Sequence, residues 1–145
     1  GNCGMEIESK SVNNAFFPKV SNITLRRAAG TVTEAGNPLE IDAIQFKKEG
    51  NGEYSNVVIS GYTSANATIV RIQDAATNTN QVATGKIKML NVKIADATPL
   101  WGAGATAFTV AFLPANFASS TTATGALLIS GAWTIVDGVN LLENL

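Results

Sequence analysis

Hydrophobic and polar residues alternate along this chain in short runs that are typical of β-strands. The largest such region is 106–135, where Phe108, Val110 and Phe112 alternate with small residues. In its second half the residues of one parity are Leu127, Ile129, Trp133 and Ile135. Pro114 and the polar run 119–122 separate the two halves. The pattern predicts two buried strands, joined by a loop, at the centre of a β core.

Shorter runs predict further strands. The alternation indicates an edge strand at 5–8 and additional strands within 22–25, 39–46, 57–59, 67–73 and 86–94. In 39–46 and 86–94 the apolar positions change parity part-way, which indicates a β-bulge or, in 39–46, a strand buried on both faces. The polar stretch 74–80 predicts a loop, and 136–139 resembles a hairpin turn.

The spacing of these runs predicts an all-β fold. We find no window with a sustained 3.6-residue apolar stripe and no internal repeat that defines a repeat architecture. Eight or nine short strands predict an immunoglobulin-like or jelly-roll β-sandwich, formed as a single domain over residues 1–145. The terminal segments 1–19 and 139–145 are candidate exchangeable strands.

Composition narrows the class of protein. With 46% hydrophobic and 14% charged residues, the chain is expected to fold into a globular domain. Ten Lys and Arg against eleven Asp and Glu leave a net charge of -1, so we expect no nucleic-acid partner. No apolar run approaches the ~20 residues of a membrane-spanning helix, so we expect no transmembrane segment. The surplus of Thr, Ala, Asn and Ser favours an extracellular or cell-surface location.

The chain contains no histidine, which removes the commonest general base and most zinc sites. Asp74, Asn78 and Asn80 offer oxygen ligands, but their spacing does not match a calcium-binding loop. The other carboxylates fall mostly in expected turns and at strand ends. We therefore predict that the protein is not an enzyme and that it binds no cofactor and no metal.

Three groups of residues are candidates for interaction. Cys3 is the only cysteine, and its position suggests the lipidated cysteine of a bacterial lipoprotein, with a plain surface thiol as the alternative. Trp101, with Leu100 and Tyr62 as neighbours, is a candidate platform for a glycan or a partner protein. The alternative is that Trp101 closes one end of the core. Candidate donor strands for β-strand complementation contain Met5, Ile7, Val139 and Leu141.

Two family resemblances follow from particular stretches. Residues 22–30, a strand at 41–46 and Ala111-Phe112-Leu113-Pro114 before a Trp-containing strand resemble fimbrillin-type pilus and adhesin domains of Bacteroidales. Residues 85–92, 105–110 and 131–135 resemble the second half of cohesin-like modules. Both resemblances imply a non-catalytic β-sandwich.

We therefore expect a non-catalytic extracellular structural or adhesive module, a subunit of a surface fibre or pilus that assembles by β-strand complementation. Its partner is then another copy of itself or another surface protein. The alternatives are a monomeric cohesin-like or carbohydrate-binding recognition module, which would bind a glycan or a protein, and a virion or phage-tail structural protein.

Overall fold

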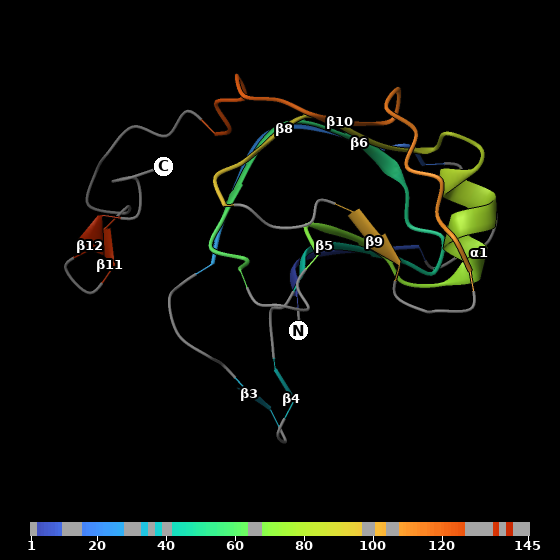
Figure 1. Ribbon diagram of the computed structural model, residues 1–145, viewed down its shortest axis with the longest axis horizontal. Helices are drawn as coiled ribbons and strands as arrows, with labels where there is room; N and C mark the ends of the chain where they lie inside the picture. The colour runs from blue at the N-terminus through green and yellow to red at the C-terminus, as the bar shows by residue number, and fades with distance from the viewer. Residues whose placement is uncertain are drawn as a thin grey trace.

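The computed structural model is built mainly of β-strands arranged in two layers (Figure 1). It describes residues 3–9, 16–27, 33–34, 37–38, 42–63, 68–96, 101–103, 108–126, 135–136 and 139–140. One four-stranded sheet, sheet A, has the order β1-β5-β7-β9, and the other, sheet B, has the order β10-β8-β6-β2. Sheet A is made of β1 (Cys3–Glu8), β5 (Asp42–Lys47), β7 (Val70–Ile72) and β9 (Trp101–Ala103). Sheet B is made of β2 (Lys19–Arg26), β6 (Gly52–Ser60), β8 (Ile87–Ile94) and β10 (Phe117–Ser119).

The chain visits the two sheets in turn, and all pairings within them are parallel. The strands β1 and β2 form a first coil, β5 and β6 a second, β7 and β8 a third, and β9 and β10 a fourth. In sheet B, Lys19 pairs with Glu53 and Glu53 pairs with Lys88, so this strand position recurs after about 35 residues. The described body is thus a parallel β-solenoid of four coils.

This architecture confirms the all-β prediction at the level of class. It does not show the predicted immunoglobulin-like or jelly-roll sandwich, because those folds pair their strands antiparallel whereas both four-stranded sheets here are parallel. The prediction of no internal repeat is also corrected, since the coils repeat. Alternation marks a residue as belonging to a strand, but it carries no information about strand direction or partner.

The core lies between the two sheets and is formed by columns of residues stacked from coil to coil. One column in sheet A contains Met5, Ile44, Val70 and Trp101, and one in sheet B contains Val20, Tyr54, Met89 and Phe117. The rings of Phe46 and Tyr54 connect the layers edge to face, with centroids 5.6 Å apart. Ile44, Val70 and Met89 are fully buried, so the core is most completely shielded from solvent in the two middle coils.

An asparagine with positive φ occurs in each of the three long strands of sheet B. Asn22, Asn56 and Asn91 have φ values of 61°, 54° and 54°. Asparagine tolerates this left-handed conformation better than most residues, and one such residue shifts the alternation of its strand. In β6 the inward positions consequently change parity between Tyr54 and Val57. The parity change predicted in 86–94 has this cause, whereas residues 42–46 of β5 are all buried, as expected for a strand covered on both faces.

The segment 120–126 runs back from β10 toward the first coil and crosses sheet B at these asparagines. The Asn56 side-chain oxygen accepts hydrogen bonds from the backbone N–H groups of Thr124 and Gly125, at 2.8 and 3.2 Å. The Asn56 amide nitrogen donates to the Asn22 side-chain oxygen at 2.7 Å, and the Ala126 N–H donates to the Thr24 hydroxyl at 3.0 Å. We call residues 120–126 the strap, because they tie the last coil to the first two.

Two predicted elements differ in the structure. The predicted loop at 74–80 instead forms helical turns, α1 (Ala75–Thr77) followed by the π-helical turn η1 (Asn78–Val82). Residues 108–113 keep the predicted alternation of half-buried and exposed side chains but form no strand, and the next strand is β10. Most of the predicted strand at 127–135 lies outside the described residues.

Two short hairpins complete the described structure. β3 (Thr33–Glu34) pairs antiparallel with β4 (Asn37–Pro38), and β11 (Ile135–Val136) pairs antiparallel with β12 (Val139–Asn140). The second hairpin confirms the turn predicted at 136–139. Both hairpins lie outside the two main layers in the view of Figure 1.

Candidate functional site

β1 forms one edge of sheet A and β2 forms one edge of sheet B, and both strands belong to the first coil, while β9 and β10 form the opposite edges. Within the described part of the chain, no strand pairs with β1 on the side away from β5 or with β2 on the side away from β6. We call this end of the solenoid the first-coil edge. An unpaired sheet edge presents a row of backbone N–H and C=O groups that can pair with another strand.

The direction of these backbone groups in β2 follows from its contacts with β6. The Glu53 N–H donates to the carbonyl oxygen of Pro18 at 2.8 Å, so the polar groups of Pro18 face β6. Backbone groups of successive strand residues point to opposite sides. The N–H and C=O of Ser21 therefore point away from β6, toward the open side, and the Ser21 side chain is exposed.

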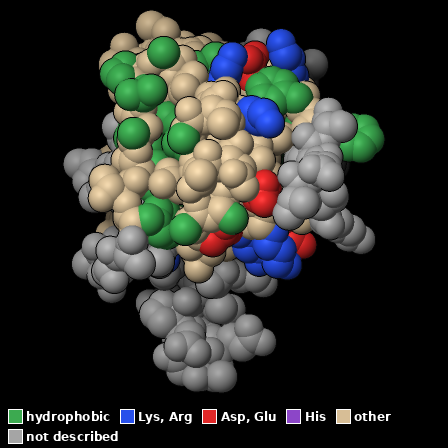
Figure 2. Space-filling model, turned by 90° about the vertical axis from the view of Figure 1, so that its right-hand side faces the viewer, with side chains coloured by type: hydrophobic (Ala, Val, Ile, Leu, Met, Phe, Trp, Pro, Cys, Tyr) green, Lys and Arg blue, Asp and Glu red, His purple; other side chains and the backbone are tan. Residues whose placement is uncertain are grey.

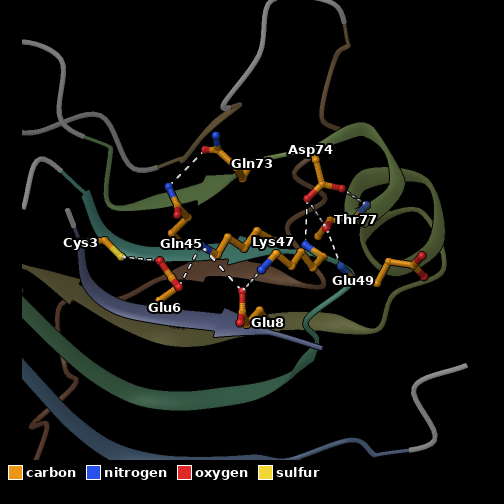
Figure 3. A network of polar contacts seen from close by, with 10 residues as sticks. Cys3, Glu6, Glu8, Gln45, Lys47, Glu49, Gln73, Asp74 and Thr77 are labelled. Carbon is orange, nitrogen blue, oxygen red and sulfur yellow. Dashed lines mark hydrogen bonds and ion pairs between the residues drawn. The ribbon is translucent and has the colours of Figure 1, made fainter. Parts of the chain in front are cut away.

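A network of charged side chains lies on the outer face of sheet A, where it connects the edge strand β1 with the end of β5 (Figure 3). The Lys47 ammonium lies 2.9 Å from a Glu6 carboxylate oxygen and 3.7 Å from one of Glu8, and Lys48 lies 2.9 Å from Glu8. The hydrogen bond from Lys48 lowers the pKa of Glu8, with a further contribution from Lys47. The hydrogen bond that Lys47 donates to Glu6 correspondingly raises the pKa of Lys47. Both shifts favour the charged forms of Glu8 and Lys47 at neutral pH.

Cys3 lies at the start of β1 and is half-buried. Burial raises the pKa of its thiol, and the nearby Glu6 and Asp42 carboxylates raise it further. The Cys3 sulfur lies 4.0 Å from a Glu6 oxygen. At neutral pH this thiol is protonated and weakly nucleophilic. Its lipidation remains a prediction from its position in the sequence.

Asp74 and Asn78, two of the candidate oxygen ligands in the sequence, form hydrogen bonds at the helical turns α1 and η1. Burial raises the pKa of Asp74, but hydrogen bonds outweigh this effect, and the pKa is lowered. Its carboxylate accepts from the Thr77 N–H at 2.8 Å, the Thr77 hydroxyl at 2.9 Å and the Lys48 N–H at 2.9 Å. The Asn78 side chain donates to the Thr109 carbonyl at 3.1 Å. In the described part of the chain, no group of three or more acidic or cysteine side chains is placed to hold a metal ion.

The aromatic candidates do not come together. Trp101 on β9 is half-buried and stacks on Phe112, with centroids 6.1 Å apart, while its ring meets Phe117 edge to face at 5.4 Å. Tyr62 is only 4% exposed, and its hydroxyl approaches Gly4 in β1. Leu100 lies outside the described residues. Trp101 therefore contributes to the aromatic cluster at the end of the core, which is the packing alternative considered from the sequence.

The candidate donor strands have different positions. Met5 and Ile7 lie in β1, which pairs with β5 of its own chain while its outer side forms part of the first-coil edge. Val139 lies in β12, which pairs with β11. Leu141 lies outside the described residues. The sequence thus located one strand of the edge, whereas β2 was not singled out for assembly. The repeated Asn-Ile and Asn-Val pairs at 22, 56 and 91 were the signal that could have identified the coils.

Comparison with known protein families, with curated proteins and with solved structures finds no match. The fimbrillin-type and cohesin-like resemblances remain predictions that rest on the stretches quoted for them. Among the described residues, no helix has the length and apolar character needed to cross a membrane.

Proposed function

We propose that this chain is a non-catalytic structural or adhesive module of an extracellular or cell-surface fibre, and that it joins a neighbour by β-strand addition at the first-coil edge. The observation that supports the proposal is that each sheet has an exposed edge strand at the same end of the solenoid. β1 has six residues and β2 has eight, and both are unpaired on the same end of the described solenoid. One neighbouring coil could therefore extend both sheets at once.

The composition and the exposed apolar side chains support the same proposal. The chain contains no histidine among its 145 residues and few charged residues, which suits a structural role better than acid-base chemistry. Phe16 is 83% exposed, Phe17 38% and Val20 38%, and all three lie at or just before β2. Large exposed apolar side chains beside an unpaired edge favour a protein partner.

Proline at position 21 tests the proposal. Ser21→Pro removes an N–H that points to the open side, so it should weaken pairing with an added strand while leaving the bonds between β2 and β6 in place. Ser21→Val is the matched control, because it keeps the N–H and has high β propensity. We expect wild type and Ser21→Val to form larger species in sedimentation velocity, and Ser21→Pro to remain monomeric with a similar melting temperature.

Two results would contradict the proposal. Wild-type protein that remains monomeric at high concentration would favour the recognition-module alternative instead. Association of Ser21→Pro at the same concentrations as Ser21→Val would show that the β2 edge is not the joining surface.

A further inference from the structure

We propose that the partner of the first-coil edge is the last coil, β9 and β10, of a second copy, so that copies stack head to tail along the solenoid axis. This inference rests on the proposed function, because it identifies the occupant of the same edge. It requires that both ends of the solenoid core are open and that the two ends match in position and charge.

Partly buried hydrophobic side chains occur at both ends of the core. In the first coil they are Met5, Ile7, Ile23 and Leu25, and at the other end they are Trp101, Phe108, Val110 and Phe112. In the middle coils Ile94, the last residue of β8, is also partly buried, but residues such as Ile44, Val57 and Val70 are fully buried. Each end therefore has apolar surface that would be covered by one more coil.

The columns of the core give the register of such a contact. Phe117 ends the column that begins at Val20, and Ser119 ends the column that contains Val92, Val57 and Ile23. One further step along these columns places Val20 of the second copy beside Phe117 and Ile23 of the second copy beside Ser119. The junction would repeat the pairing that β10 already makes with β8 inside the chain.

Charge distinguishes this arrangement from a symmetric one. A head-to-head dimer would pair each edge strand antiparallel with its own copy, which brings Glu6 and Glu8 of β1 near the same two residues. Lys19 and Arg26 of β2 would likewise face each other. Like charges directly across paired strands destabilise a sheet. The described edge strands of the last coil, Trp101–Ala103 and Phe117–Ser119, carry no charged residue, so head-to-tail pairing avoids this repulsion.

The molecular surface shows the same difference between the two ends. Figure 2 is turned so that the front of Figure 1, with β9 and β10, lies toward the left, and on the side that it shows the hydrophobic side chains gather mainly on the left while the charged ones lie in the centre and toward the right. Leu113, which is 56% exposed, lies in the segment that leads to β10. The solenoid is therefore polar along its axis, and a polar unit that repeats head to tail forms an open filament.

Cysteine cross-linking tests the arrangement. In a Cys3→Ser background, Ile23→Cys and Ser119→Cys are made as two separate proteins, each with a single thiol. Neighbouring strands lie about 4.8 Å apart, within the Cα separation that a disulfide spans. We expect a disulfide-linked dimer under mild oxidation when the two proteins are mixed, little from either protein alone, and loss of the product when Ser21→Pro is added to the Ile23→Cys protein. Because Ile23 is partly buried, the pair Ser21→Cys and Ala118→Cys, one residue along from Val20 and Phe117, provides a second test.

The outcomes separate this inference from the proposed function. Cross-linking of the Ile23→Cys protein with itself, without a product in the mixture, would show head-to-head pairing and overturn the inference. If the wild-type protein associates in sedimentation but neither cysteine pair forms a cross-link, the head-to-tail inference is also overturned. Assembly of a fibre through a different contact would then still stand. A wild-type protein that remains monomeric would overturn both.

Discussion

Replacing Asn56 should lower the free energy of unfolding by an amount set by the hydrogen bonds that its side chain makes. The Asn56 side-chain oxygen accepts from the N–H groups of Thr124 and Gly125 and from the Thr124 hydroxyl. Its amide nitrogen donates to the Asn22 oxygen, the Thr124 hydroxyl and the Gly125 carbonyl. Asn56→Gly removes these bonds and keeps a residue that adopts positive φ without strain. The variant therefore measures the hydrogen bonds apart from the backbone conformation.

The expected magnitude follows from the number and exposure of these bonds. A typical protein hydrogen bond contributes about 0.5–1.5 kcal/mol to stability, and the partly exposed bonds of Asn56 belong at the low end of that range. Asn56 makes six such contacts, but three share its oxygen and three share its two amide hydrogens, so together they are equivalent to about four full bonds. At this level their loss lowers the free energy of unfolding by about 2–3 kcal/mol. For a domain of this size the melting temperature should fall by roughly 5–10 °C.

Asn91→Gly provides the matched control. Asn91 has the same φ of 54°, and no hydrogen bond of its side chain occurs within the described part of the chain. We expect this substitution to change the free energy of unfolding by less than about 0.5 kcal/mol. Urea denaturation of both variants, with limited proteolysis of the strap, provides the measurement. Equal stability of the two variants would refute the view that Asn56 ties the strap to the coils.

Three further variants test local contacts. Gly4→Ala places a Cβ against the Tyr62 hydroxyl and should destabilise the fold by about 1–3 kcal/mol, with a smaller loss in a Tyr62→Phe background, as measured by urea denaturation. Burial raises the pKa of Tyr54 to about 12, so its contribution to stability is complete below pH 10 and is lost between about pH 10 and 12. Denaturation across that range should therefore show a steeper loss for wild type than for Tyr54→Phe, and parallel curves would contradict the assignment. Asp74→Ala should lower the free energy of unfolding by about 1–2 kcal/mol, because the Asp74 carboxylate caps α1 through Thr77. Asp74→Asn should retain most of the stability, and urea unfolding of the two variants tests this. Equal losses would show that capping is not the role of Asp74.

The sequence located most of the long strands but not their arrangement. The alternation of Met5 and Ile7 with glutamates identified β1, and the apolar runs at 57–59 and 86–94 identified β6 and β8. Which strands pair, and in which direction, depends on contacts between residues about 35 positions apart, such as Tyr54 and Met89. Such contacts leave only a weak signal in a single sequence with coils of unequal length.

Local chemistry explains the other differences. The polar run 74–80 lacks an apolar stripe, yet Asp74 caps its first turn, and the buried Thr77 and Gln81 take part in hydrogen bonds that hold it in place. Residues 108–113 alternate like a strand because Phe108, Val110 and Phe112 pack against the core while the residues between them are exposed, although the segment forms no ladder. For the candidate site, the sequence indicated β1 through Met5 and Ile7. The outward direction of the Ser21 backbone depends on the contacts of β2 with β6 and required the structure.

The most direct test of the central claim is electron microscopy of filaments from the wild-type protein, with analysis of their diffraction. Head-to-tail stacking of subunits with four coils each predicts a strand spacing of about 4.8 Å along the filament axis and a subunit repeat of about 19 Å. Filaments with both spacings would support the account. Monomers or closed dimers alone, or filaments with the strand spacing across the axis, would contradict it.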